Sequence, residues 1–255
     1  MQHLVFLVLG LGNGAVFAAL AMALVVTYRS SGVVNFATGA IALYCAYTFA
    51  FMRNGQLLMP LPGLKKTYPL PFTPPLLVAI GLSLLVAVAL GAALYLAIFR
   101  PLRAAPVVAK AVASIGVMVL LQAVLAQKVG TKPVNTRSIF PKGTVRMSGI
   151  NVQQQMLWLA FTVVLITALL WLAFRYTRFG LATRAAAETE KGALVTGLSP
   201  DRIALVNWCL SAAVAALAGI LIAPIAPIVP VSYTLYVVTA LAAALVGGFT
   251  VLPIA

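Results

Sequence analysis

The chain has 255 residues, of which 63% are hydrophobic and 8% are charged, and its mean hydropathy is +1.10. A soluble domain carries about 25% charged residues, so this composition excludes a domain whose whole surface faces water and indicates one covered by bilayer hydrocarbon. The formal net charge is +14, but the basic residues lie in short stretches between apolar runs. That distribution favours membrane lipid over nucleic acid as the negatively charged partner.

Seven apolar segments follow one another along the chain. Each has about 18–25 residues, which is enough to cross the ~30 Å of bilayer hydrocarbon as a helix. No charged residue lies near the middle of a segment, where it would cost about 2.5–3.5 kcal/mol of insertion free energy. The pattern predicts one all-α domain over residues 1–255, a polytopic transmembrane helical bundle with about seven spans. The segments are Leu4–Tyr28, Val33–Met52, Leu76–Phe99, Val107–Gln127, Leu157–Phe174, Ile203–Ile222 and Leu235–Pro253.

Three longer polar stretches connect these segments. Two of them, about 53–75 and about 128–156, are rich in proline and glycine and are not expected to form long helices. Of the 17 Lys and Arg residues, nine lie on the side of the third stretch, about 175–202, which leaves eight on the opposite side. The two sides therefore carry nearly equal numbers of basic residues, so the positive-inside rule does not settle the orientation. The nine residues lie in shorter loops, which only slightly favours their side as cytoplasmic.

The stretch about 175–202 predicts a short helix lying across the end of the bundle. The predicted helix is Thr183–Val195, with Thr183 as its N-cap and Gly197 after its end. Two interpretations stay open: an ordinary solvated interfacial helix, or a docking helix whose alanines let the groove of a soluble partner close around it. The stretch also holds all three acidic residues of the chain, Glu188, Glu190 and Asp201.

The sixth apolar segment is preceded by a helix-start signal. Ser199 is the expected N-cap, and Pro200 suits the first helical position. Asp201 then offsets the positive end of the helix dipole. The sequence thus predicts that Asp201 stabilises the start of its own helix.

Several short motifs are spread over nearly the whole chain. They are Gly12-Asn13-Gly14 with Asn35–Gly39 (NFATG), Arg100–Arg103 (RPLR), Ile115-Gly116 to Gln122, Arg178–Glu188 (RFGLATRAAAE) with Gly197 and Arg202, Ala218-Gly219, and Leu245–Gly248 (LVGG). Each motif alone is weakly specific. As an ordered set they resemble the permease subunits of ATP-binding cassette (ABC) importers of the branched-chain amino acid (LivH/LivM) family.

The chain departs from this family pattern at three places. It has Thr38 where the family usually has His, and Val237–Ala244 lacks the family's KAF-type residues. It stops at Ala255, where relatives continue through a further helix or more. The resemblance therefore predicts a chain truncated at its C-terminus, either a fragment or part of a longer fusion.

The resemblance also implies a mechanism. Such a permease pairs with a second permease subunit, as a homo- or heterodimer, and the two line one translocation path for branched-chain or other small amino acids. Cytoplasmic ATP-binding subunits grip the coupling helix, and an extracytoplasmic substrate-binding protein delivers the substrate. This arrangement places the stretch about 175–202 in the cytoplasm and the other two stretches outside. The N-terminus is then outside a bacterial inner membrane that the chain crosses several times.

The expected ATPase-coupling residues lie in and directly after the predicted crossing helix. A close fit between helix and groove is needed to transmit motion, so small and charged side chains there are the candidates. These residues are Arg184, Ala187, Glu188, Lys191, Leu194 and Gly197.

The expected residues of the translocation path are polar or flexible positions inside the spans. An uncharged polar group in lipid must find a partner or face a water-filled cavity, so helix–helix hydrogen bonding is the competing interpretation, also for Asn207. Asn35 and Thr38 are the stronger candidates because flanking Gly32 and Gly39 can break the helix and free backbone groups. The candidates are Asn13, Asn35, Thr38, Gly39, Ser114 and Gln122.

The sequence argues against an enzyme. The one histidine is His3, and no GxxxxGK[ST] phosphate-binding loop occurs, so neither a His-based site nor ATP binding is expected. We expect no metal and no cofactor. Two alternatives to an ABC permease stay open: a self-contained secondary transporter or channel for a small neutral solute, and a membrane scaffold subunit without a path. The first usually needs ionisable residues inside its spans, and none is present.

Overall fold

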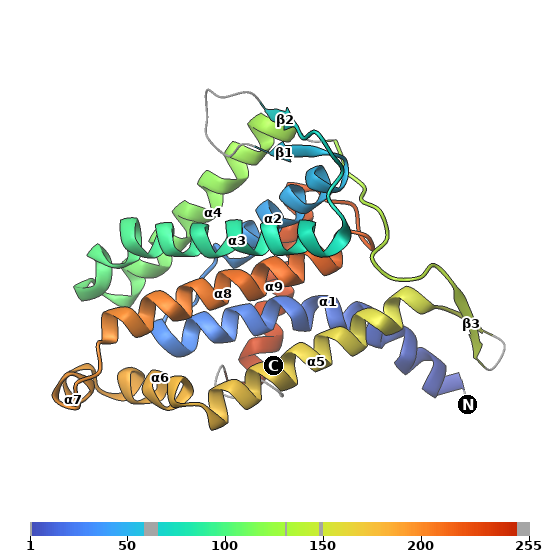
Figure 1. Cartoon of the computed structure of the whole chain (residues 1–255). Coiled ribbons are helices and arrows are strands. Elements are labelled where there is room, and N and C mark those ends of the chain that lie inside the picture. The colour runs from blue at the N-terminus through green and yellow to red at the C-terminus, as the bar shows by residue number, and fades with distance from the viewer. Residues whose placement is uncertain (1, 59–65, 131, 148–149, 249–255) are drawn as a thin grey trace.

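The structure is a computed structural model, which describes residues 2–58, 66–130, 132–147 and 150–248 (Figure 1). It is almost entirely helical, and each of the seven predicted apolar segments contains one long helix. In chain order these are α1 (Gln2–Ser31), α2 (Thr38–Arg53), α3 (Leu76–Leu94), α4 (Val107–Val129), α5 (Gln154–Tyr176), α8 (Pro200–Ile222) and α9 (Pro230–Val246). The end of the last predicted segment lies outside the described residues.

Five of these helices are long and apolar enough to cross a membrane unaided. They form the spans Gly10–Arg29, Leu76–Phe99, Val107–Val129, Gln154–Tyr176 and Pro200–Ile222. Helices α2 and α9 have 16 and 17 residues, which is short for a span of about 20 residues. The chain is thus an all-α polytopic membrane protein, and seven spans remains the prediction from sequence.

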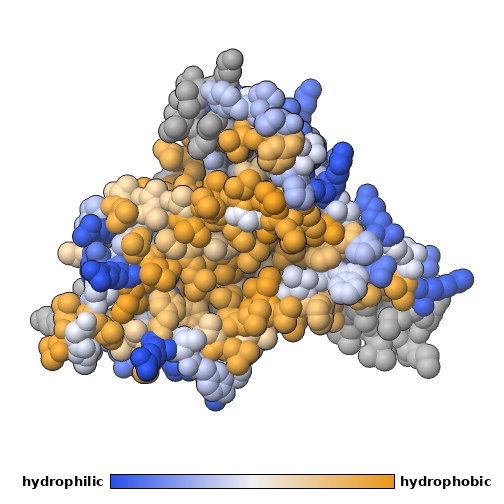
Figure 2. Space-filling model, viewed as in Figure 1, coloured by the Kyte–Doolittle hydropathy of each residue, from blue (hydrophilic) through white to orange (hydrophobic). Residues whose placement is uncertain are grey.

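The helices divide into a buried core and an exposed shell. Within the candidate spans, 71% of the α1 span and 67% of the α8 span is buried inside the protein. The corresponding values for α3, α4 and α5 are only 22%, 17% and 28%. Nearly every residue of α2 is buried as well. Large apolar side chains such as Leu77, Phe161 and Val164 project outward from the shell helices. Figure 2 shows the result, a broad hydrophobic face across the middle of the molecule with hydrophilic residues at its edges.

Small residues allow the core helices to pack closely, as expected for helices in lipid. A Cβ on Gly219 of α8 would collide with the backbone carbonyl of Ala42 in α2. α8 also bonds to α1, since Ser211 Oγ donates to the Ala23 carbonyl at 3.0 Å and also meets the Thr27 hydroxyl. α8 therefore holds α1 and α2 together.

The connection between α3 and α4 consists of two short irregular helical turns. A π-helical turn, η1 (Tyr95–Phe99), follows α3, and the Arg100 N–H bonds to the Tyr95 carbonyl at 2.7 Å. A 3₁₀ turn, η2 (Pro101–Ala104), then leads toward α4. The family-like RPLR motif thus forms the turn itself.

Two β-hairpins lie in the proline-rich stretches, where the sequence predicted only the absence of long helices. In the first, β1 (Gln56–Leu58) pairs with β2 (Thr67–Pro69); in the second, β3 (Thr144–Met147) pairs with β4 (Ile150–Gln153). Strands of three or four residues carry too little alternation to be read from sequence.

The two ends of the molecule differ. Two short helices, α6 (Arg178–Glu188) and α7 (Glu190–Val195), lie with the α3–α4 turn at one end. The N-terminal end of α1 and strand β3 lie at the opposite end (Figure 1). The stretch about 175–202 therefore closes one end of the bundle.

Candidate functional site

The short helices α6 and α7 lie at one end of the bundle, and we call this pair the crosspiece. They are separate helices because Thr189 has an extended backbone (φ −146°, ψ 113°). The predicted single helix Thr183–Val195 is therefore wrong in two respects. The crosspiece begins at Arg178, with Thr177 rather than Thr183 as its N-cap, and the Thr177 hydroxyl accepts a bond from the Gly180 N–H at 3.2 Å. Thr177 is itself a capping residue type, so a local signal for the earlier start was present in the sequence.

α6 is fixed to the end of α5 by a close backbone approach. A Cβ on Gly180 would collide with the carbonyl of Phe174, the last buried residue of α5. Arg184 reaches back to the same end, and its Nη2 donates to the carbonyls of Phe174 at 3.1 Å and Arg175 at 3.2 Å. A guanidinium satisfies the free carbonyls at a helix C-terminus and offsets its partial negative charge. The predicted coupling residue Arg184 thus anchors the crosspiece.

α6 is also bonded to α8 through two buried polar side chains. Asn207 of α8 is fully buried, and its Nδ2 donates to the Thr183 hydroxyl at 3.1 Å and to the Ile203 carbonyl at 2.9 Å. Thr183 is 2% exposed and lies inside α6, so it is not the N-cap. Asn207, considered from sequence as a path residue, instead joins two helices.

Of the four α7 residues whose side chains are described, Gly192, Leu194 and Val195 are exposed. Ala193 is buried, whereas Leu194 is 58% and Val195 is 89% exposed. Gly197 ends the helix as predicted: its φ is +79°, its N–H bonds to the Leu194 carbonyl, and the Leu198 N–H bonds to the Ala193 carbonyl. This wrapped end with a left-handed glycine is a standard helix C-cap.

The other predicted coupling residues are exposed, except Lys191, whose side chain is not among those described. Ala187 and Glu188 are exposed at the end of α6. Lys191 belongs to α7, but its side chain lies outside the described residues. Sequence reasoning missed the exposed apolar side chains Leu181 and Val195, although an apolar residue in a charged loop is a signal that could have found them.

The chain between α1 and α2 is unwound inside the protein. Gly32 has a φ of +64° and ends α1, so α2 begins at Thr38 instead of at Val33 as the apolar segment suggested. Asn35 is 3% exposed, and its Oδ1 accepts the Ala37 N–H at 3.0 Å. The segment directly follows the end of the candidate span of α1 at Arg29. Gly32 was therefore predicted correctly as a helix breaker.

Three predicted path residues meet in this unwound segment. The Thr38 hydroxyl donates to the Asn35 carbonyl at 2.7 Å. Ser114 of α4 accepts the Phe36 N–H at 3.2 Å and donates to the Ala111 carbonyl. Asn35, Thr38 and Ser114 thus hold the unwound backbone in place.

The remaining predicted path residues do not join that group. Gly39 does not break the helix; it lies in α2, where a Cβ would collide with Val237 of α9. Gln122 is half-buried on α4, and the side chain of Asn13 on α1 lies outside the described residues. Gly39 is therefore a packing position.

A pocket of about 720 Å³ lies between the crosspiece and the bundle. Its walls are the end of α1, the segment 32–35, η1, α6 and the start of α8, with single residues from η2, α4 and α5. Aromatic side chains line much of it, including Trp208, which stacks on Phe99 with ring centroids 4.1 Å apart. Among the described residues no cluster of His, Cys, Asp or Glu has the make-up of a metal site.

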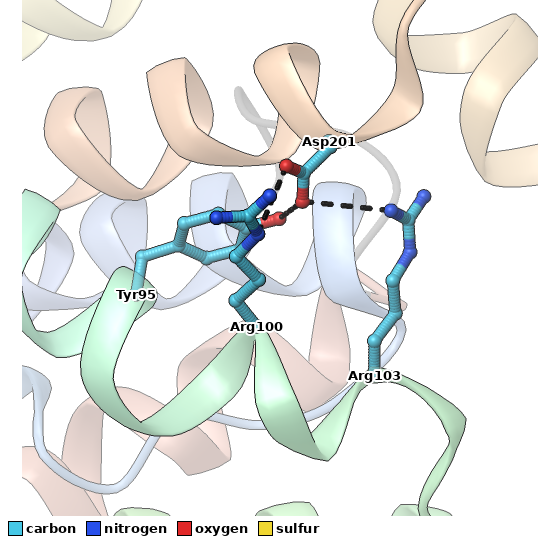
Figure 3. Close-up of polar contacts among 4 residues, drawn as sticks. All are labelled: Tyr95, Arg100, Arg103 and Asp201. Atoms are coloured by element: carbon cyan, nitrogen blue, oxygen red, sulfur yellow. Dashed lines mark hydrogen bonds and ion pairs between the residues drawn. The ribbon is translucent and has the colours of Figure 1, made fainter.

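A polar cluster fastens the start of α8 beside this pocket (Figure 3). Asp201 accepts a bond from the Tyr95 hydroxyl at 2.7 Å and forms ion pairs with Arg100 at 3.2 Å and Arg103 at 3.5 Å. We call Tyr95, Arg100, Arg103 and Asp201 the clasp. It joins the RPLR turn to the first turn of α8, so Asp201 does more than offset a helix dipole. Sequence reasoning missed this pairing because about a hundred residues separate its halves.

The fold and this site define a class of protein: a polytopic helical membrane protein with two short helices at one end, the first of which is bonded to two of the long helices. A sequence model of the family described as "Branched-chain amino acid transport system / permease component" matches residues 6–255. The chain belongs to this family, as its motifs predicted, and it is a transport permease component.

Curated relatives agree with that assignment. The high-affinity branched-chain amino acid transport system permease protein LivH of Salmonella typhimurium is 28% identical over 219 residues, which cover 84% of this chain and 68% of LivH. BraD of Pseudomonas aeruginosa, with the same description, is 28% identical over 225 residues, covering 87% and 71%. A probable LivH of Methanocaldococcus jannaschii is 29% identical over 238 residues, covering 90% and 69%. No solved structure matches the chain.

Proposed function

We propose that this chain is the permease subunit of an ABC importer in a bacterial inner membrane. It would form half of a translocation path for branched-chain or other small amino acids, the path being completed by a second permease subunit. The observation that carries the proposal is the crosspiece: a helix fixed to α5 and α8 that continues into a helix with exposed apolar side chains.

The crosspiece has the properties that a coupling element needs. A push on its outer surface must reach the spans without being absorbed by local bending, which requires rigid attachment. The Gly180 contact and the bonds of Arg184 and Asn207 attach α6 to two spans. Ala187 and Glu188 are exposed at the end of α6 and also line the pocket, while Leu194 and Gly197 are exposed farther along the chain. A cytoplasmic ATP-binding subunit would bind at these residues and at Lys191.

We propose that the path passes the unwound segment between α1 and α2. Discontinuous helices form substrate sites in other transporters because their free backbone groups can contact the solute. Val33, Asn35 and Ala37 of this segment are buried, and Asn35 also lines the pocket. The candidates Asn13, Asn35, Thr38, Gly39, Ser114 and Gln122 would line the path or shape its wall.

The proposal assigns sides of the membrane. The crosspiece would face the cytoplasm, while the two hairpins and the N-terminus would face outward, toward a substrate-binding protein. A single cysteine at Glu188 or at Val145, in a background without Cys45 and Cys209, tests this. We expect a membrane-impermeant thiol reagent to label Val145→Cys in intact cells and Glu188→Cys only after permeabilisation. Labelling of both in intact cells would contradict the proposed topology.

Uptake into vesicles tests the function itself. The chain would be reconstituted with its second permease, ATP-binding subunits and substrate-binding protein, and radiolabelled leucine uptake measured with and without internal or external ATP. We expect uptake only when ATP reaches the crosspiece side and all subunits are present. Uptake by the chain alone, without ATP-binding subunits, would instead show a self-contained transporter or channel.

A further inference from the structure

The last turns of α5 carry a cluster of aromatic and basic side chains that the proposed coupling role does not use. The Arg175 guanidinium lies 4.9 Å from the centre of the Trp171 ring and 5.6 Å from the centre of the Tyr176 ring. The two rings meet edge to face, with centroids 6.1 Å apart and planes at 89°. We call Trp171, Arg175 and Tyr176 the aromatic–basic cluster.

The positive charge of this cluster is not matched by a carboxylate. The structure gives the Arg175 guanidinium two ring contacts and, within the residues that it describes, no ion pair. Contact with ring faces leaves the N–H groups at the guanidinium edge able to donate hydrogen bonds. Arg175 is exposed, so an anion arriving from outside the protein would meet a donor whose orientation is already fixed.

The cluster lies at the end of a membrane span. The candidate span of α5 is Gln154–Tyr176, which places Arg175 at the level of lipid headgroups. Phosphate is the common anion at that level. The position of the cluster therefore favours a phospholipid as the source of the anion.

The rest of the span offers an apolar surface below the cluster. Only 28% of the α5 span is buried, and five large apolar side chains on it are between 45% and 62% exposed. Their spacings of three, four and seven residues place them on one side of the helix. Acyl chains can lie along this side. The five residues are Phe161, Val164, Leu165, Leu169 and Leu172.

The surrounding charge favours a headgroup with a net negative charge. Arg178, three residues beyond Arg175, is also exposed. A zwitterionic headgroup would bring its own cation close to these two arginines, which is unfavourable. An anionic headgroup such as phosphatidylglycerol has no such cation.

The backbone of the same turn anchors the crosspiece. Arg184 of α6 donates to the carbonyls of Phe174 at 3.1 Å and Arg175 at 3.2 Å. A lipid held by the Arg175 side chain would therefore steady the residue to which α6 is bonded.

We propose that the aromatic–basic cluster binds the headgroup of an anionic phospholipid. Arg175 donates to the phosphate, and the acyl chains lie along the exposed side of α5. The site stabilises the attachment of the crosspiece. It does not depend on the proposed import function or on the side of the membrane that the crosspiece faces.

Trp171 provides a direct reporter of the bound lipid. W158F removes another tryptophan that faces outward, at 42% exposed, whereas Trp208 is only 3% exposed. The W158F full chain is placed in phosphatidylcholine nanodiscs that contain increasing fractions of brominated phosphatidylglycerol or brominated phosphatidylcholine. Quenching of tryptophan emission is recorded. We expect phosphatidylglycerol to reach half-maximal quenching at about a tenfold lower fraction, the factor expected for one charge-assisted hydrogen bond.

Substitutions in the same background test the residues of the site. R175Q should abolish the preference for phosphatidylglycerol, and R175K should keep only part of it, because lysine retains the charge but not the planar stacking. R202Q is the matched control. Arg202 is an exposed arginine at the start of α8, with no ring contact among the described residues, so R202Q should keep the full preference.

Thermal unfolding of the detergent-solubilised chain gives a second readout that does not use tryptophan. Phosphatidylglycerol should raise the melting temperature more than phosphatidylcholine does, and R175Q should remove that difference. The proposal is overturned if both brominated lipids quench equally or if R202Q loses the preference as R175Q does. Full preference in R175K would also overturn it, because charge alone would then explain the binding.

Discussion

The two helices of the crosspiece are neighbours in sequence but are held to the protein in different ways. α6 is bonded to α5 through Arg184 and to α8 through Thr183, and Gly180 lets it touch the α5 backbone. α7 has Ala193 as a buried contact, and Leu194 and Val195 face outward. We propose that α7 contacts the ATP-binding subunit and that α6 transmits the resulting displacement to α5 and α8.

The first prediction tests the close contact between α6 and α5 by adding a methyl group at Gly180. Gly180→Ala places a Cβ against the Phe174 carbonyl, and overpacking against backbone costs about 1–3 kcal/mol. Gly192→Ala in α7 is the matched control, since its Cβ would meet only the Thr189 side chain. We expect thermal unfolding to show a clear loss for Gly180→Ala and at most about 0.5 kcal/mol for Gly192→Ala. Equal losses would remove the distinction between the two helices.

The bond between α6 and α8 should show the next largest effect. Asn207→Leu leaves the buried Thr183 hydroxyl without its donor, which costs about 1–3 kcal/mol. The double variant with Thr183→Val removes both polar groups and should recover much of that loss, because the Asn207 Oδ1 has no hydrogen-bond partner among the described residues. Unfolding of the two single variants and the double variant measures the coupling. Strict additivity would mean that this bond does not hold α6.

The clasp should contribute least, because it is partly exposed. Asp201→Asn removes the ion pairs to Arg100 and Arg103, and such pairs contribute about 0–1 kcal/mol. The loss in unfolding free energy should shrink further at about 1 M salt, where exposed charges are screened. Tyr95→Phe is the control, since it deletes one neutral donor and its effect should not depend on salt. A salt-independent loss for Asp201→Asn would argue against an electrostatic role.

The sequence predicted the positions of the seven long helices well because each apolar run is a local property. It also identified Gly32 and Gly197, since a left-handed backbone favours glycine. Thr183 was assigned the capping role that Thr177 has, since both are capping residue types. Asp201 and the RPLR turn meet only in three dimensions. Polar residues inside the spans were found, but sequence could not separate Asn35, which shapes an unwound segment, from Asn207, which joins two helices.

The central claim is that the outer surface of α7 contacts an ATP-binding subunit. A photo-crosslinking amino acid at Val195, with the same substitution at Val145 in β3 as control, tests this in membranes that contain the whole transporter. Both positions are exposed, at 89% and 41%, and they lie at opposite ends of the molecule. We predict that illumination joins position 195, and not position 145, to the ATP-binding subunit. No adduct from position 195, or equal adducts from both positions, would contradict the account.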